Sequence, residues 1–258
     1  MRMTSTNDAH RLGTRRRTLG KSVFPILLSL LFSPGTAWAD WMLLLHEDAS
    51  GKLGGNWEGR VEVEAKFRNN MSEFYDLEAM PWMACRVTEW FKLGFGWREL
   101  YSRRNTEIYG RKSEEGSDSP TYPKVAEHYW VVEHRPLVDF LFSAKAKSWT
   151  LEDRVRGEFR NIEGQDAFFR VRNRFRVRPP WAWTPAEIQP WAAWESYFEG
   201  NPALAWSDRF NRNRFFVGLG AKLSPRIKVG CYYYWEILLT PEELEYNHEI
   251  GLETGLVF

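Results

Sequence analysis

The sequence alternates between apolar and charged residues with a period of two over most of its length, and this pattern limits the fold more than any other feature does. In residues 57–68 the odd positions, such as Trp57 and Phe67, are apolar or small, while the even positions, from Glu58 to Arg68, are all charged. Such alternation is typical of a β-strand with two different faces, and no helical period sorts these residues as cleanly. The pattern predicts an all-β protein.

Ten segments share this alternation: 57–69, 73–84, 90–102, 128–143, 149–161, 167–178, 187–198, 209–223, 226–239 and 245–258. Each is long enough for a tilted strand that crosses a bilayer, which needs about 9–11 residues. Short connections alternate with longer ones, of which 103–127 is the longest. An even number of strands joined in this way is typical of an outer-membrane barrel, whose short turns face the periplasm. We expect a closed antiparallel up-and-down transmembrane β-barrel of about ten strands, to which residues 41–47 either add a strand or contribute a periplasmic segment.

The first 39 residues do not alternate and predict an export signal. A basic stretch at 15–21 precedes an apolar run at 23–32, and Ala37 and Ala39 fit cleavage before Asp40. The apolar run is too short to span a bilayer as a helix. The chain is therefore expected to consist of an export signal peptide at 1–39 and an outer-membrane barrel domain at 40–258.

Removal of this signal changes the charge of the protein. The whole chain has 35 Lys and Arg against 34 Asp and Glu, whereas residues 40–258 have 29 against 33, a net charge of −4. Binding to nucleic acid through bulk positive charge is therefore not expected. The chain also combines 14 Trp with a mean hydropathy of −0.50, which is expected when rings face lipid and charges fill the interior.

The charged faces favour a membrane barrel over a soluble sheet. A solvated sheet face mixes Lys, Glu, Ser and Thr, but the hairpin 149–178 places eight arginines on one face. Guanidinium groups suit desolvated, bidentate pairing with carboxylates. We predict a lumen charge network that consists of Arg60, Glu62, Glu64, Glu78, Arg98, Arg154, Arg156, Glu158, Arg160, Arg170, Arg172, Arg174, Arg176, Glu195, Arg212, Arg214, Glu249 and Glu253.

These arginines allow two kinds of lumen. Unpaired, they favour an anion-conducting passage. However, a barrel of ten strands is only slightly wider than one that side chains fill, and the inward bases and acids are nearly balanced. We therefore favour a lumen that Arg–Glu pairs largely close, in a barrel that is structural or forms a narrow, porin-like channel.

Aromatic residues and the last segment indicate the outer membrane of a Gram-negative-type bacterium. Interfacial girdles of rings are expected from Trp residues near the predicted strand ends: Trp82, Trp90, Trp130, Trp149, Trp181, Trp183, Trp194 and Trp206. The final alternating segment ends at Phe258, and a terminal aromatic residue of this kind is read by the barrel-assembly machinery. We expect a monomer in contact with outer-membrane lipid and lipopolysaccharide, with no nucleic-acid partner.

Four Arg-rich or Gly-rich segments carry a family resemblance. Residues 93–98 (LGFGWR), 151–160 (LEDRVRGEFR), 169–174 (FRVRNR) and 209–214 (RFNRNR) resemble strands of the bacterial barrels grouped as domain of unknown function 2490. The resemblance covers nearly the whole chain after the signal. It implies an outer-membrane location and brings no known activity and no catalytic residues.

The sequence offers little catalytic or metal chemistry. The histidines are far apart without an H-x-x-x-H motif, and there is no G-x-S-x-G. Cys85 and Cys231 lie on apolar faces three strands apart around a ten-strand barrel, so we predict two unpaired thiols. We expect no cofactor, metal site or catalytic residue. Two alternatives remain, an enzyme that hydrolyses lipid or peptide at the rim near His128, and a soluble periplasmic carrier.

Overall fold

The structure is a computed structural model that describes residues 41–108, 124–181, 187–201, 204, 206–239 and 244–258. The predicted export signal lies outside these residues. The described residues form one short helix, η1 (Trp206–Arg209), and eleven strands: β1 (Trp41–Gly54), β2 (Trp57–Arg68), β3 (Glu73–Arg86), β4 (Phe91–Ile108), β5 (Lys124–Ala146), β6 (Trp149–Ile162), β7 (Phe168–Arg178), β8 (Gln189–Glu199), β9 (Arg212–Lys222), β10 (Ile227–Leu239) and β11 (Leu244–Val257). In this part of the chain no helix is long and apolar enough to cross a membrane.

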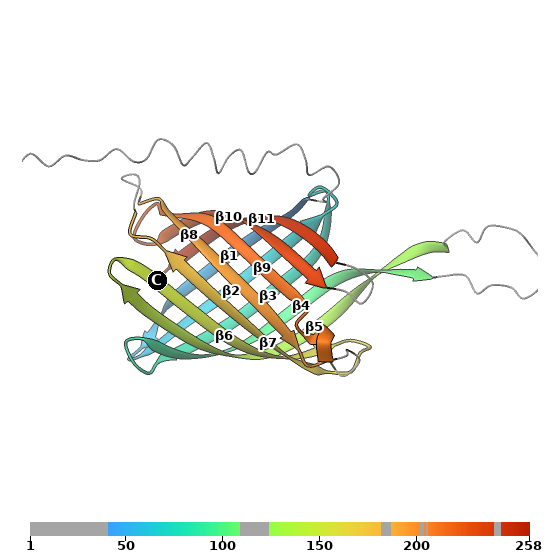
Figure 1. Cartoon of the computed structure of the whole chain (residues 1–258), viewed down its shortest axis with the longest axis horizontal. Coiled ribbons are helices and arrows are strands. Elements are labelled where there is room, and N and C mark those ends of the chain that lie inside the picture. The colour runs from blue at the N-terminus through green and yellow to red at the C-terminus, as the bar shows by residue number, and fades with distance from the viewer. Residues whose placement is uncertain (1–40, 109–123, 182–186, 202–203, 205, 240–243) are drawn as a thin grey trace, which may run out of the picture. The chain divides into compact units, whose positions relative to one another are not determined.

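The strands form one closed barrel, as expected, in the order β1-β11-β10-β9-β8-β7-β6-β5-β4-β3-β2 (Figure 1). From β2 to β11 each strand pairs with the next in antiparallel fashion. Strand β1 completes the barrel by pairing antiparallel with β2 and parallel with β11.

The expected ten-stranded, wholly antiparallel barrel is therefore one strand short and lacks the parallel pair. The extra strand includes residues 41–47, whose place the sequence left open. Its alternation is broken, because Leu43, Leu44 and Leu45 are consecutive apolar residues and Glu47 and Asp48 are consecutive acids. Hydrogen bonding on both sides, from Trp41 opposite His248 to Ser50 opposite Val257 and from Leu43 opposite Phe67 onward, makes this segment a strand nevertheless.

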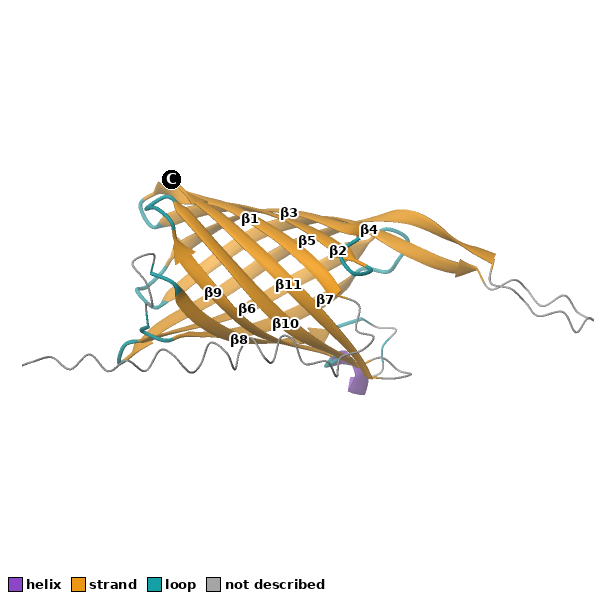
Figure 2. Ribbon diagram, turned by 90° about the horizontal axis from the view of Figure 1, so that it is seen from above, coloured by secondary structure: helices purple, strands orange, loops and turns teal. Residues whose placement is uncertain are grey.

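The ten predicted strands are all present, and two of them are longer than expected. The ladder between β4 and β5 continues to the pair Ile108–Lys124, so the two strands take up both ends of the predicted connection 103–127. This hairpin extends past the other strands (Figures 1 and 2). Backbone pairing sustains it where side-chain alternation has stopped, and residues 109–123 lie outside the described part of the chain.

The connections define two rims. We call the end with connections 55–56, 87–90, 147–148, 179–188 and 223–226 the turn rim, and the end with 69–72, 163–167 and 200–211 the loop rim. Because β1 is parallel to β11, Trp41 lies at the loop rim and Val257 at the turn rim. The start of β1 and the end of β11 therefore lie at opposite rims, although the two strands are neighbours.

Burial is inverted relative to a soluble protein. The largest fully buried side chains are Arg156, Met80, Glu158, Glu195, Glu249 and Asp139, so all but one are charged. The odd residues of β9, from Phe215 to Leu219, point outward, and large apolar side chains on most of the other strands, such as Val61, Phe95 and Leu252, are exposed. A solvated sheet buries the apolar face instead.

Most of the predicted surface Trp side chains are exposed: Trp90, Trp130, Trp149, Trp181 and Trp194. The prediction is wrong for Trp82, which is buried inside the barrel, where its Nε1 donates a hydrogen bond to Asp139. Trp183 and the Trp206 side chain lie outside the described residues.

The prediction of two unpaired cysteines is confirmed. Cys85 and Cys231 are free, and Cys231 is exposed. They lie four strand steps apart rather than three, because β1 stands between β11 and β2.

Candidate functional site

The interior of the barrel holds a polar cavity of about 780 Å³, lined by side chains from all eleven described strands. It extends from Glu152 and Arg178 near the turn rim to Ser102 and Leu238 near the loop rim. Sixteen of the eighteen residues of the predicted lumen charge network line it. The other two, Arg156 and Glu158, are inside the barrel as well and are fully buried. The structure thus brings the whole predicted set into one interior.

The most deeply buried ion pair joins β5 and β6. Arg156 holds Asp139 in bidentate fashion, with Nε and Nη2 each 2.7 Å from a carboxylate oxygen, and both side chains are 0% exposed. The indole of Trp82 donates a third hydrogen bond to Asp139 at 2.8 Å. Such geometry is needed to offset the desolvation of two charges. Asp139 was not predicted, because it stands in the apolar run 136–142, where alternation does not show which face is inward.

A second network links β6, β7 and β8. Arg172 bridges two buried carboxylates, Glu158 at 3.1 Å and Glu195 at 2.9 Å. Glu158 also accepts a hydrogen bond from Arg170 Nε at 2.7 Å, and Glu195 accepts one from the Tyr197 hydroxyl at 2.7 Å. Every carboxylate oxygen in this network has a donor, so these charges fix the relative positions of three strands.

Further pairs connect the remaining strands. Glu78 on β3 accepts hydrogen bonds from Lys66 and Arg98, both at 2.7 Å. Glu236 on β10 pairs with Arg214 of β9 at 2.5 Å. On the loop-rim side Glu133 binds two guanidinium groups, from Arg135 and Arg160. Arg135 was not predicted, although it shares its face of β5 with Glu133 and the alternation of that segment was sufficient to find it.

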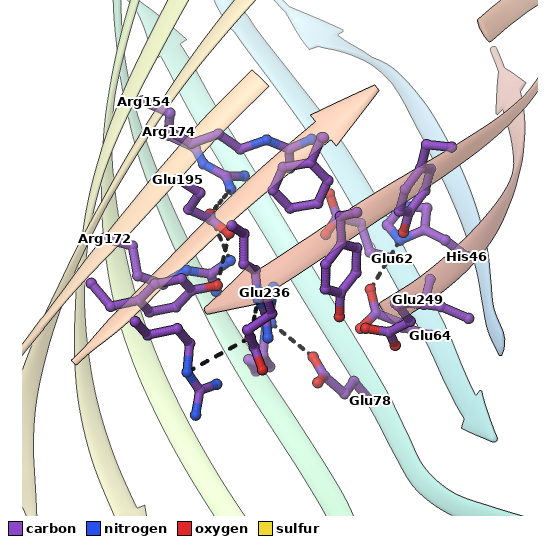
Figure 3. A pocket seen from close by; sticks show the side chains of 18 of the residues that line it. His46, Glu62, Glu64, Glu78, Arg154, Arg172, Arg174, Glu195, Glu236 and Glu249 are labelled. Carbon is purple, nitrogen blue, oxygen red and sulfur yellow. Dashed lines mark hydrogen bonds and ion pairs between the residues drawn. The ribbon is translucent and has the colours of Figure 1, made fainter. Parts of the chain in front are cut away.

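Positive and negative charges are not mixed evenly around the cavity. We call the cavity-lining charges of β6–β9 the arginine wall: Arg154, Arg160, Arg170, Arg172, Arg174, Arg176, Arg178, Arg212 and Arg214, with Glu152, Asp153 and Glu195. We call those of β10, β11 and β1–β3 the acidic wall: Asp48, Glu62, Glu64, Asp76, Glu78, Glu236, Glu249 and Glu253, with Arg60, Lys66 and His46. Figure 3 shows arginines of the first wall facing carboxylates of the second. A solute in the cavity therefore meets opposite fields on its two sides.

Several of these charges have no ion-pair partner. Within the described part of the chain, Arg174 and Arg176 make neither an ion pair nor a hydrogen bond, and each lies over an aromatic ring instead: Arg174 over Phe216 at 4.9 Å and Arg176 over Trp191 at 4.5 Å. On the acidic wall the 1% exposed Glu249 likewise has no ion pair among the described residues. Pairing therefore does not neutralise the lumen completely.

Two glycines let the aromatic rings lie close to the barrel wall. A Cβ at Gly218 would lie 2.5 Å from the Trp191 ring, and one at Gly251 would lie 2.0 Å from the Tyr232 ring. Real side chains cannot approach so closely, so any larger residue there would push the ring toward the cavity. The glycine positions on the inward face thus keep lumen space open.

The histidines and carboxylates of the described residues were compared with the requirements of a metal site. Among them no group of three His, Cys, Asp or Glu side chains is arranged to hold a metal ion. His46 contacts Glu64 at 3.4 Å in the acidic wall. The backbone of His128 pairs with Asn105 in the extended hairpin, and its side chain lies outside the described residues.

Comparison with known proteins identifies a family and a similar solved structure. The model of a family described as a protein of unknown function, DUF2490, matches residues 41–247. No curated protein matches the chain. Among solved structures, the chain is similar to the beta domain of the Bordetella autotransporter Brka, with a TM-score of 0.47 and 13% sequence identity over 74% of this chain and 79% of that one.

Proposed function

The chain belongs to the DUF2490 family, and we propose that it is an outer-membrane β-barrel whose charged lumen is a narrow passage for small polar solutes. In this arrangement the short connections of the turn rim face the periplasm and the loop rim faces outward. The outward face contacts lipid, with lipopolysaccharide in the outer leaflet, and the barrel-assembly machinery acts on the final strand.

The observation that carries the membrane location is the inverted burial. Fully buried arginines and carboxylates occupy the interior, while Val61, Phe159 and Phe215 are exposed on a closed surface of strands. In water such a continuous apolar surface is an aggregation liability. In a bilayer it is favourable, and the closed ladder leaves no unpaired strand edge for lipid to contact. This distribution disfavours a soluble carrier.

The passage is supported by the cavity and by the incomplete pairing. The sequence favoured a lumen closed by Arg–Glu pairs, and such pairs do occupy part of it. A cavity of about 780 Å³ nevertheless has lining residues near both rims. Polar walls with fixed charges of both signs suit water and small charged solutes rather than lipid.

The test is to produce the full-length chain, with its own predicted signal, in a Gram-negative host that lacks major porins. We expect recovery with the outer membrane, and discrete conductance steps when the purified barrel is added to planar bilayers. The same preparation, unfolded by boiling in detergent, is the control. Recovery in the soluble periplasmic fraction would contradict the membrane location. A membrane-embedded barrel without conductance would contradict the passage alone.

A further inference from the structure

The arginines of β7 divide into two groups that differ in their partners. Arg170 and Arg172 hold Glu158 and Glu195, with the pairs at 2.5 Å and 2.9 Å. Arg174 and Arg176 continue the same inward face and have no ion pair or hydrogen bond within the part of the chain that the structure describes. Along this strand face, the first two arginines are therefore neutralised by carboxylates and the next two are not.

The carboxylate that lies opposite Arg174 in the ladder is already engaged. Arg174 lies opposite Glu195 in the ladder with β8, but Glu195 accepts hydrogen bonds from Arg172 and Tyr197. On its other side Arg174 lies opposite a further arginine, Arg154, whose ion pair with Glu195 is long, at 3.4 Å.

The same holds for Arg176. It lies opposite Glu152 in the ladder with β6, but Glu152 pairs with Arg178 at 2.9 Å. On β8 it faces Ala193. Among the described residues, no carboxylate is therefore within ion-pair distance of Arg174 or Arg176, although Glu253 lines the same cavity.

Aromatic rings hold these guanidinium groups in place. Trp191 and Phe216 cover one face of Arg176 and Arg174, respectively, and Trp191 itself lies against Gly218. A ring beneath a guanidinium fixes its plane without using its N–H groups. Donors that are fixed in advance cost less entropy when a ligand binds.

We propose that Arg174 and Arg176, together with Arg154, form an oxyanion-binding subsite in the lumen. It takes the carboxylate or phosphate group of a small solute, because a planar guanidinium fork matches two oxygens of such a group. The acidic wall across the cavity, with Glu62, Glu249 and Glu253, repels a second negative charge on the solute. The subsite thus selects small solutes with a single anionic group.

The binding test uses the folded full-length barrel in detergent and inorganic phosphate as the probe, with chloride at equal ionic strength as the reference. Thermal unfolding midpoints are measured for the wild type, for R174Q/R176Q and for the control E152Q/R178Q. The control removes a neighbouring ion pair of the same wall as a unit, so that no carboxylate is released toward Arg176. Any general salting effect of phosphate remains in all three proteins.

We expect phosphate to raise the midpoint of the wild type and of E152Q/R178Q, with at least a tenfold weaker apparent affinity for R174Q/R176Q. Loss of two unpaired charges is not expected to prevent folding, and the midpoint without phosphate checks this directly. An equal phosphate response in all three proteins, or no response beyond chloride in the wild type, overturns the proposal.

The consequence for transport rests on the proposed passage and is measured separately. In a bilayer with a KCl gradient, the reversal potential of R174Q/R176Q is expected to shift toward cation selectivity relative to E152Q/R178Q. An unshifted reversal potential in conducting barrels overturns the role of the subsite in selectivity. If no protein conducts but phosphate still binds, the passage is wrong and the subsite stands.

Discussion

At the scale of single residues, the charges inside this barrel occupy the place of a hydrophobic core. The pair of Arg156 and Asp139 is the clearest case, because both side chains are fully buried and joined by two hydrogen bonds of 2.7 Å. Removal of one partner leaves an uncompensated buried charge. We expect Asp139→Ala or Arg156→Ala to lower the free energy of unfolding by about 3–5 kcal/mol, measured by urea unfolding with Trp fluorescence.

The control is an exposed pair of the same barrel. Lys222 lies 3.4 Å from Glu187, and both side chains are 63% exposed. Lys222→Ala is therefore expected to cost about 0–1 kcal/mol. Similar losses for the two kinds of pair would show that the interior is hydrated enough to screen its charges, and would contradict the structural role given to the Arg156–Asp139 pair.

Two glutamates on the adjacent strands β1 and β2 point to opposite faces of the barrel wall. Glu47 on β1 is exposed on the outer face between Val63 and Thr254, whereas Glu64 on β2 points inward and contacts Lys66 at 3.1 Å. In a bilayer, Glu47→Leu should raise stability by about 1 kcal/mol, since a charge on the lipid face is unfavourable. Glu64→Leu should lower it, because Lys66 loses a partner. Unfolding from lipid vesicles measures both, and two changes of the same sign would be the contradictory outcome.

The sequence was sufficient to predict which residues point inward, but not which ones pair. The parity of 167–178 placed Arg170 and Arg172 on one face. Their partners Glu158 and Glu195 come from other strands, and the stagger between strands decides which charges meet. Asp139 was missed because its segment is apolar on both faces, and Trp82 because a ring near a strand end does not reveal its direction.

At the scale of elements, glycine and aromatic residues on adjacent strands act together. Trp191 of β8 lies over Gly218 of β9, where a Cβ would be 2.5 Å from the ring. Gly218→Ala is therefore expected to destabilise the barrel by about 1–3 kcal/mol, as an overpacked interior does. The loss should be much smaller in a Trp191→Leu background, because the clashing ring is gone. Equal losses in both backgrounds, measured by thermal unfolding, would show that the ring does not impose the requirement for glycine.

The strands themselves were the most predictable part of the fold, and β1 shows where such prediction fails. Segments such as 209–223 have one lipid-facing and one lumen-facing side, so alternation reveals them. β1 has three consecutive leucines and two consecutive acids, from Leu43 to Asp48. Its extended conformation comes from neighbours on both sides, β2 and β11, which are close to it only in the folded barrel.

At the scale of the whole molecule, the parallel pair of β1 and β11 predicts an unusual sidedness. Trp41 lies at the loop rim with Asn70, and Ser224 lies at the turn rim. In a variant with Cys85 and Cys231 changed to serine, single cysteines at these three positions are treated on intact cells with a membrane-impermeant maleimide. We expect W41C and N70C to react, and S224C to react only after lysis. Reaction of W41C together with S224C would mean that β1 does not close the barrel as described.

The strand number of the whole barrel could not be read from the sequence. An even count with alternating turn lengths fitted a wholly antiparallel barrel, and nothing in residues 41–54 required a parallel neighbour. Closure depends on whether β2 and β11 meet directly or accept a strand between them, which is decided by the circumference of the assembled sheet.

The central claim is that this barrel is inverted, with lipid outside and charge inside. The most direct test attaches spin labels one at a time along β9 in outer-membrane vesicles, at 213, 215, 217, 219 and 221, with Arg212 and Lys222 as water-facing references. We predict that the five odd positions are accessible to oxygen and shielded from a water-soluble nickel chelate, while the references show the reverse. Free access of the chelate to the odd positions, as on a soluble barrel, would contradict the claim.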